Sequence, residues 1–135
     1  MIMGIGVDLV AINRIKKIID RFPERFLNRI FTEREKQNFL ESSSSAASLA
    51  ARFAAKEASL KAIGCGIGPA ALKEVEIITS PGRQPLVKLH GEAARLAKAK
   101  QITAIVVSLT HEPPFACAVA AAWNGPAADG QHQPG

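Results

Sequence analysis

The sequence has few of the residues that characterise disulfide-rich and nucleic-acid-binding proteins. Its 135 residues include two cysteines, one tryptophan and no tyrosine. Cys65 and Cys117 do not have the spacing of a metal-ligand pair, so we expect reduced thiols and a cytoplasmic protein. RNA-binding sheets stack bases on exposed aromatic residues. This chain has no strand of that kind, which argues against a small basic RNA-binding module.

The sequence also lacks long apolar runs and a basic leader. Its longest apolar run, residues 115–123 (FACAVAAAW), is too short to cross a bilayer as a helix. The first ten residues carry no positive charge, so we expect neither a signal peptide nor a membrane anchor. The composition is that of a globular protein. We expect one domain over residues 1–124 and a disordered tail, rich in glycine and proline, over residues 125–135.

Positive charge is concentrated in the N-terminal third of the chain. The net charge is +5, and residues 14–36, with eight basic and four acidic side chains, contribute +4 of it. A solvated basic surface explains this concentration as well as an anionic partner does. Arg14, Lys17 and Arg21 fall on one face of the helix expected at 12–22, so they are the candidate partner-binding residues.

Hydrophobic periodicity predicts an α+β fold with the order β-α-α-α-β-β-α-β-β. Short turns join the paired strands, which indicates a mainly antiparallel sheet, packed on a long buried helix. Strands are expected at 4–10, 72–80, 85–90, 103–112 and 115–123. Helices are expected at 12–22, 31–40, 46–63 and 91–100.

The helix expected at residues 46–63 carries charges although its pattern is that of a buried helix. Alanine covers one side and larger apolar residues cover the other. Pairing of Glu57 with Lys61, four residues later, is one explanation for the charges. The other is a ligand site in which Arg52, Lys56 and Lys61 face a bound anion. Glu57 would then face a cation that neutralises it.

Asp8 is the candidate second carboxylate of such a site. It follows the apolar segment GIGV, where the alternative role is capping of the next helix. The glycines before it do not complete a dinucleotide-binding fingerprint, because Leu9 occupies the third glycine position. Mg²⁺ takes one or two carboxylates together with water and phosphate oxygens. Asp8 and Glu57, with lysines near them, therefore suit a metal-bound phosphate ligand.

Three further residues have a structural explanation beside a functional one. Glu35 has capping-box spacing to Thr32, so we do not assign it to catalysis. Gly64 is either a simple helix C-cap or part of a backbone nest that binds phosphate. His111 ends the strand VVSLTH, where it is a structural residue, a phosphate contact or a general base.

Four segments, in the order GIGVDLV, RIFTEREK, RFAAKEASLKAIGCGIG and SLTHE, resemble the bacterial holo-acyl-carrier-protein synthases, the small 4′-phosphopantetheinyl transferases. The resemblance covers residues 1 to about 123. It implies transfer of phosphopantetheine from coenzyme A to a serine of apo acyl carrier protein, with release of adenosine 3′,5′-bisphosphate, in the service of fatty acid biosynthesis. It also implies a homotrimer with active sites between subunits. The strand at 115–123 is apolar on both faces, which supports its burial between subunits.

The resemblance also assigns roles to residues. Asp8 of the GxD motif and Glu57 of the KEA motif would bind Mg²⁺. Lys61 and His111 would contact coenzyme A, and Lys61 and Lys56 would stabilise developing negative charge. Glu57, or a metal-bound water near it, would accept the serine proton. A non-catalytic protein that binds a phosphate ligand is the remaining alternative, but it gives no reason for two carboxylates beside the lysines.

Overall fold

The structure is a computed structural model, and it describes residues 1–42, 45–65 and 71–126. The strands are β1 (Ile2–Ala11), β2 (Val75–Ile78), β3 (Leu86–Leu89), β4 (Ala104–Glu112) and β5 (Phe115–Trp123). The helices are α1 (Ile12–Arg21), α2 (Pro23–Ile30), α3 (Glu33–Ser42), α4 (Ala46–Ile63) and α5 (Gly91–Ala99). None of the described helices is long and apolar enough to cross a membrane.

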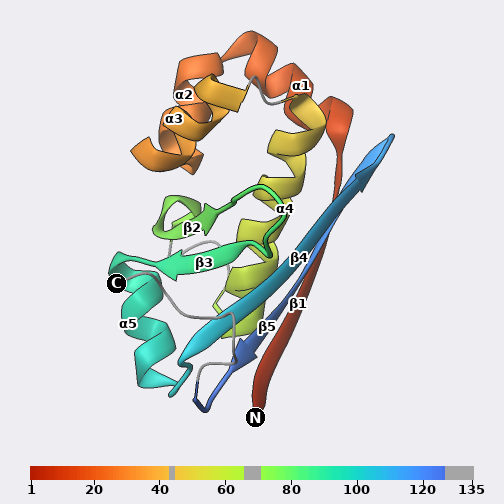
Figure 1. Ribbon diagram of the computed structural model, residues 1–135. Helices are drawn as coiled ribbons and strands as arrows, with labels where there is room; N and C mark the ends of the chain where they lie inside the picture. The colour runs from red at the N-terminus through yellow and green to blue at the C-terminus, as the bar shows by residue number, and fades with distance from the viewer. Residues whose placement is uncertain (43–44, 66–70, 127–135) are drawn as a thin grey trace.

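One antiparallel sheet, with strand order β1-β5-β4-β3-β2, packs on the long helix α4 (Figure 1). The expected α+β fold is therefore confirmed, with one additional helix, α2. Pro23 stands in the first turn of α2, where its missing N–H removes no intrahelical hydrogen bond. A 3-10 turn at Leu72–Glu74 precedes β2, which begins later than expected. The tail from residue 127 onward, and residues 66–70 of the glycine-rich segment, lie outside the described residues.

Helix α4 begins and ends where the sequence predicts. The side chain of Ser45 caps its N-terminus by accepting a hydrogen bond of 3.2 Å from the Ser48 N–H. Gly64 adopts the left-handed conformation, with φ of 89°, and its N–H bonds to the carbonyls of Leu60 and Lys61. Gly64 is therefore a helix C-cap, which is one of the two roles that the sequence predicted for it.

Strand β1 lies directly against α4 because two of its inward-facing residues are glycines. A Cβ atom at Gly4 would lie 2.1 Å from the carbonyl oxygen of Ala62. A Cβ atom at Gly6 would lie 2.0 Å from the carbonyl oxygen of Ala58. The strand and helix backbones therefore approach more closely than any side chain would allow. Asp8 follows on the same face of β1, so this contact brings its carboxylate close to α4.

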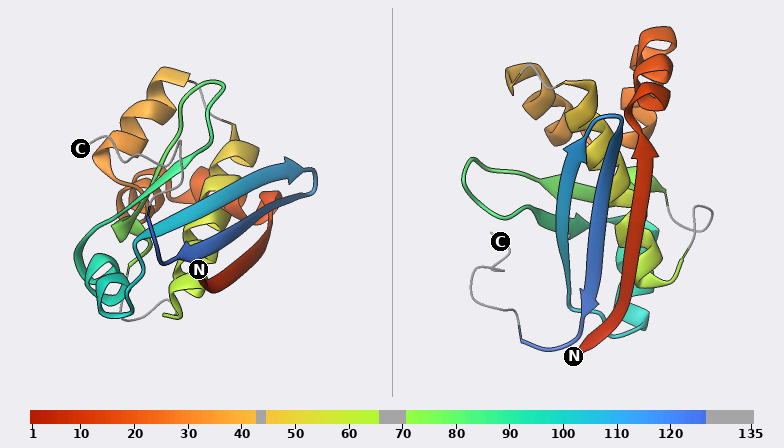
Figure 2. Two further views of the ribbon diagram at one scale, coloured as in Figure 1. Left: turned by 60° about the horizontal axis from the view of Figure 1, so that its bottom comes forward. Right: turned by 90° about the vertical axis from the view of Figure 1, so that its right-hand side faces the viewer.

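The right-hand view of Figure 2 looks onto the outer face of β1 and β5, the face opposite α4. In the described chain the side chains of this face are apolar and exposed. The β1 side chains on this face are between 44% and 65% exposed: Met3, Ile5, Val7 and Leu9. Phe115 and Val119 of β5 are each 46% exposed. The inward residues of β5 are alanines buried beneath α4. An apolar patch of this kind is typical of a protein interface.

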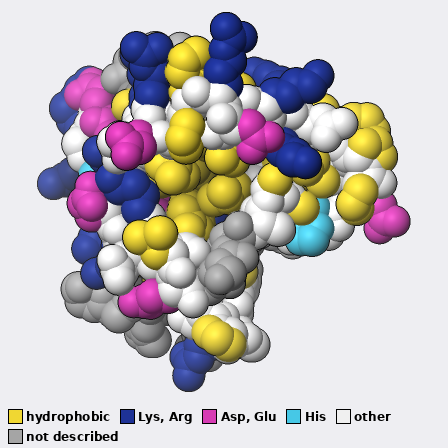
Figure 3. Space-filling model, turned by 90° about the horizontal axis from the view of Figure 1, so that it is seen from above, with side chains coloured by type: hydrophobic (Ala, Val, Ile, Leu, Met, Phe, Trp, Pro, Cys, Tyr) yellow, Lys and Arg dark blue, Asp and Glu magenta, His cyan; other side chains and the backbone are white. Residues whose placement is uncertain are grey.

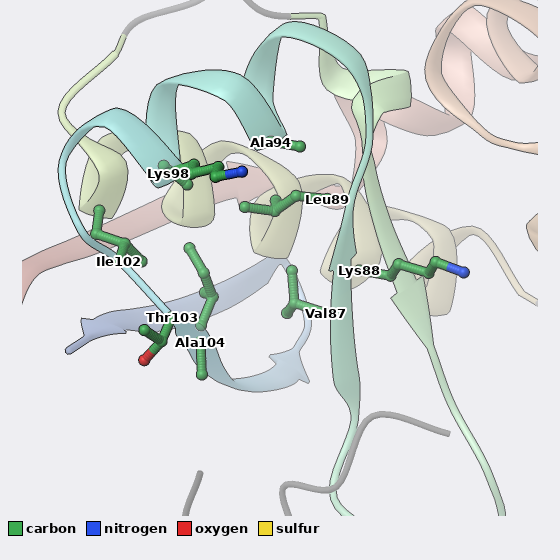
Figure 4. A pocket seen from close by; sticks show the side chains of 10 residues that line it. Val87, Lys88, Leu89, Ala94, Lys98, Ile102, Thr103 and Ala104 are labelled. Atoms are coloured by element: carbon green, nitrogen blue, oxygen red, sulfur yellow. The ribbon is translucent and has the colours of Figure 1, made fainter. Parts of the chain in front are cut away.

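A groove lies between α5 and strands β3 and β4. The two strands share one register pair, Leu86 with Val106, and they diverge beyond it. The groove has a volume of about 220 Å³, and its lining is mainly aliphatic (Figure 4). Lys98 extends over it from α5. None of its described lining residues is acidic, so the groove does not match the metal-bound phosphate site that the sequence predicts.

Candidate functional site

The carboxylates of Asp8 on β1 and Glu57 on α4 lie near each other where the strand and the helix pack. Burial and the negative charge of Asp8 raise the pKa of Glu57 above its usual range. The positive charges of Lys61 and Arg14 act in the opposite direction. Two neighbouring carboxylates of which one is half-buried favour a cation between them.

Lys61 connects α4 to β1 at this point. Its Nζ lies 3.2 Å from Asp8 Oδ1 and donates a hydrogen bond of 3.0 Å to the Val7 carbonyl. The alternative interpretation, an ion pair of Lys61 with Glu57 within the helix, is therefore not the arrangement found. The Lys61 side chain is 52% exposed and that of Asp8 is 13% exposed, so the ammonium lies at the solvent side of the pair.

Arg14 belongs to the same charged group, although sequence reasoning assigned it to partner binding alone. It is exposed in the first turn of α1, which follows β1 directly, and its charge lowers the pKa of Glu57. Lys17 and Arg21 are exposed on the same helix. Seen from above, both basic and acidic side chains border an apolar hollow (Figure 3). The sequence signal that links Arg14 to the site is that Arg14 follows Asp8 closely along the chain, just after the junction of β1 with α1.

The structure does not place Lys56 at this site. Lys56 is fully buried, and its Nζ lies 2.8 Å from Glu35 Oε1. It also donates to the carbonyls of Leu72 (3.2 Å) and Val75 (2.6 Å). The prediction that Lys56 faces a bound anion is therefore wrong. The helical pattern shows that Lys56 lies in the apolar stripe, but it does not show which neighbouring element supplies a carboxylate.

Glu35 has the capping role that the sequence predicts and a second role that it did not. Its Oε1 accepts the Thr32 N–H at 2.8 Å, and the Thr32 hydroxyl accepts the Glu35 N–H at 3.2 Å, which is a capping box. The Oε2 atom accepts the Ile77 N–H at 3.0 Å. Glu35 is therefore the buried partner of Lys56, and it is not part of the Asp8–Glu57 pair.

Arg52 lies apart from the carboxylate pair. Its Nη1 donates to the hydroxyl and carbonyl of Ser48, and its Nη2 lies 3.3 Å from the Thr79 hydroxyl. The guanidinium carbon lies 5.2 Å from the centre of the Phe39 ring. Burial lowers the pKa of Arg52. With Arg34 it lines a small cavity of about 90 Å³, which is a second basic position on the chain.

His111 and Gly64 also lie away from the carboxylate pair within one chain. His111 is exposed near the end of β4, where it pairs with Ala116 of β5, and Ala116 pairs with Val10 of β1. His111 is therefore on the same sheet face as Asp8, but it is two strands away. The C-cap role of Gly64 explains that residue without a ligand.

The residues present fit Mg²⁺. This ion binds one or two protein carboxylates and keeps water and substrate phosphate oxygens as its other ligands. The described residues contain no cluster of three or more Asp, Glu, His or Cys side chains that would enclose a metal. Asp8 and Glu57 therefore fit a metal that is shared with a phosphate substrate, and they do not fit a closed structural zinc site.

Comparison with known proteins shows the class to which this chain belongs. The profile of the 4′-phosphopantetheinyl transferase superfamily matches residues 4–120. The holo-[acyl-carrier-protein] synthase of Natranaerobius thermophilus is 40% identical over 124 residues, which cover 92% of this chain and 99% of that protein. The chain belongs to the 4′-phosphopantetheinyl transferase superfamily.

Similar solved structures come from one group of enzymes within this superfamily. The crystal structure of the holo-[acyl-carrier-protein] synthase from Neisseria meningitidis matches with a TM-score of 0.83 and 30% identity, covering 92% of this chain and 100% of that one. The Helicobacter pylori synthase, in complex with coenzyme A, matches with a TM-score of 0.77 and 32% identity, covering 88% and 99%. Within the superfamily, these relatives are holo-[acyl-carrier-protein] synthases, so the resemblance carried by the four sequence segments is confirmed.

Proposed function

We propose that this chain transfers the 4′-phosphopantetheinyl group of coenzyme A to a serine hydroxyl of an apo acyl carrier protein. The observation that carries the proposal is the pair of carboxylates, Asp8 and Glu57, with Lys61 beside them in a chain of this superfamily. The serine oxygen forms a bond to the β-phosphorus of coenzyme A. The bond from that phosphorus to the leaving group breaks, and adenosine 3′,5′-bisphosphate departs.

The residues of the carboxylate pair have separate tasks in this reaction. Asp8 and Glu57 would hold Mg²⁺, which would polarise the pyrophosphate and offset the charge of the leaving group. Glu57, directly or through a water molecule near it, would accept the serine proton. Lys61 is half-exposed, so it can turn from Asp8 to the phosphate oxygens and stabilise their charge.

A homotrimer with active sites between subunits is part of the proposal. Arg52 and His111 are separate from the carboxylate pair within one chain, so their contribution to coenzyme A binding requires a neighbouring subunit. The exposed apolar face of β1 and β5 supports such an assembly, because burial of this face between subunits would stabilise the trimer. The basic face of α1 would bind the acidic carrier protein. Coenzyme A and a carrier protein as substrates, with both cysteines free, favour the cytoplasm.

Mass spectrometry of the carrier protein tests the proposed function. After incubation with this protein, coenzyme A and Mg²⁺, the carrier should gain the mass of one phosphopantetheinyl group. A chelator should prevent the gain, and added Mg²⁺ or Mn²⁺ should restore it. Asp8→Asn and Glu57→Gln should fold but transfer nothing, because an amide is a poor Mg²⁺ ligand. Binding of coenzyme A without any gain in mass would support a phosphate-ligand binding protein instead.

A further inference from the structure

The ion pair of Lys56 and Glu35 is buried, and the proposed reaction does not use it. The Lys56 side chain is 0% exposed and the Glu35 side chain is 2% exposed. Such a pair contributes little net stability compared with apolar side chains of the same size, because both charges lose their hydration. The presence of this ion pair in the protein core, between α4 and α3, therefore indicates a role other than stability alone.

The pair connects α4 to three other segments of the chain. The Lys56 ammonium has three donors, and its three acceptors are Glu35 and the carbonyls of Leu72 and Val75. Glu35 in turn accepts the Thr32 N–H at the start of α3 and the Ile77 N–H of β2. These bonds fix the direction in which the Lys56 side chain leaves α4.

The same direction determines where Glu57 points. Successive residues of a helix are about 100° apart, so the orientation of Lys56 sets that of its neighbour. Strand β1 and strand β2 lie on different sides of α4 (Figure 1), and β1 holds the helix through the close contacts at Gly4 and Gly6. A rotation of α4 by about 10° would move a carboxylate roughly 6 Å from the helix axis by about 1 Å. Metal sites require their ligands to be placed within about 0.5 Å.

We propose that the Lys56–Glu35 ion pair sets the rotation of α4 so that the Glu57 carboxylate meets Asp8 at the metal position. Lys56 and Glu35 are then positioning residues, which act through Glu57 and touch neither substrate. This inference rests on the proposed function, because it requires the metal site at Asp8 and Glu57.

The double variant Lys56→Met/Glu35→Gln tests the proposal. A single charge left in the core can unfold the protein, whereas the double variant removes both charges and keeps similar volumes. Glutamine at position 35 still offers an oxygen to a backbone N–H. We expect a folded protein whose Mn²⁺ affinity, measured by electron paramagnetic resonance with coenzyme A present, is 10- to 100-fold weaker, as for other supporting residues of metal sites. The value of kcat/KM should fall with it.

Ile63→Val provides the matched control. Ile63 is buried on α4 and takes no part in the ion pair, so the variant should lower Tm and leave Mn²⁺ affinity unchanged. If the double variant does not fold, Glu35→Asp, which keeps both charges and shortens the carboxylate arm by one methylene, takes the same measurement with the same expectation. Unchanged Mn²⁺ affinity in the folded variant overturns the positioning role alone. A wild-type protein that binds no Mn²⁺ and modifies no carrier overturns the proposed function, and the positioning role with it.

Discussion

At the scale of single residues, Glu57 destabilises the folded protein when it is ionised. Burial and Asp8 raise its pKa, so the folded state holds the proton more tightly than the unfolded state does. Above the raised pKa the folded state bears the full destabilisation. The effect declines as the pH falls through that pKa, and it disappears below the ordinary value of 4.5.

Glu57→Gln should therefore raise Tm at about pH 8, by roughly 1–3 °C, because the variant has no charge to bury. The difference should disappear at about pH 4, where Glu57 is protonated in both states. Scanning calorimetry of wild type and variant at the two pH values checks this. A lower Tm of the variant at the higher pH would contradict the prediction, since it would show that the ionised carboxylate is stabilised by its surroundings.

Sequence reasoning identified Asp8, Glu57 and Lys61 because a charge in an apolar segment is conspicuous without any structure. It could not assign Lys56, which has the same pattern, because helical periodicity gives the direction of a side chain only relative to its own helix. The partner, Glu35, lies 21 positions away along the chain and had an adequate local explanation as a cap. Long-range partners of buried charges depend on the packing of elements, which periodicity does not contain.

At the scale of elements, the contact of β1 with α4 depends on glycine. Gly6→Ala should lower the free energy of unfolding by about 3 kcal/mol or more, because its Cβ would overlap the Ala58 carbonyl and the backbone must move. Urea denaturation measures the loss. Gly82→Ala is the control. Its φ of 70° is unfavourable for alanine, but apart from the adjacent residues no atom lies within 4 Å of the added Cβ. We therefore expect the free energy of unfolding to fall by only roughly 1–2 kcal/mol. Equal losses in the two variants would contradict a close strand–helix contact.

The exposed basic face of α1 leads to a prediction about docking. Arg14→Glu should raise the KM for the carrier protein about tenfold, because it reverses a charge on the face that we expect to meet the acidic carrier. The wild-type rate should also fall as salt screens these exposed charges. Lys98→Glu, on α5, is the matched charge reversal and should leave this KM unchanged. Carrier-protein kinetics that are unaffected by Arg14→Glu would show that the carrier docks elsewhere.

The elements themselves were predictable to different degrees. The bounds of α4 follow from a serine N-cap, a glycine C-cap and a continuous apolar pattern, and the structure has the same bounds. Helix α2 was not expected from the sequence, because Pro23 is equally compatible with the end of one helix and the first turn of the next. The pairing of β1 with β5 was not predictable, since neither strand has the alternation of apolar and polar residues that would indicate a register.

At the scale of the whole molecule, the apolar outer face of β1 and β5 predicts an interface between subunits, and the family resemblance implies that the assembly is a trimer. Val7 and Val119 pair in register near the middle of this face. Val7→Lys should convert the trimer to a monomer and reduce the rate of transfer strongly, because a charge would be buried at the interface. Light scattering at micromolar concentration measures the mass. Leu40→Lys, at an exposed apolar residue of α3, should leave the trimer intact. A monomeric wild-type protein would contradict the prediction.

The position of β5 in the sheet has a consequence for the synthesis of the protein. It lies between β1 and β4 but follows every other described element along the chain. While a ribosome is still making the chain, β1 therefore has no partner strand, and contacts between distant segments of this kind form late in folding. An unfinished chain can present the basic helix α1. However, β1, which positions Asp8 against α4, gains its partner strand only when residues 115–123 have left the ribosome. Incomplete chains would therefore meet the carrier protein without being able to modify it.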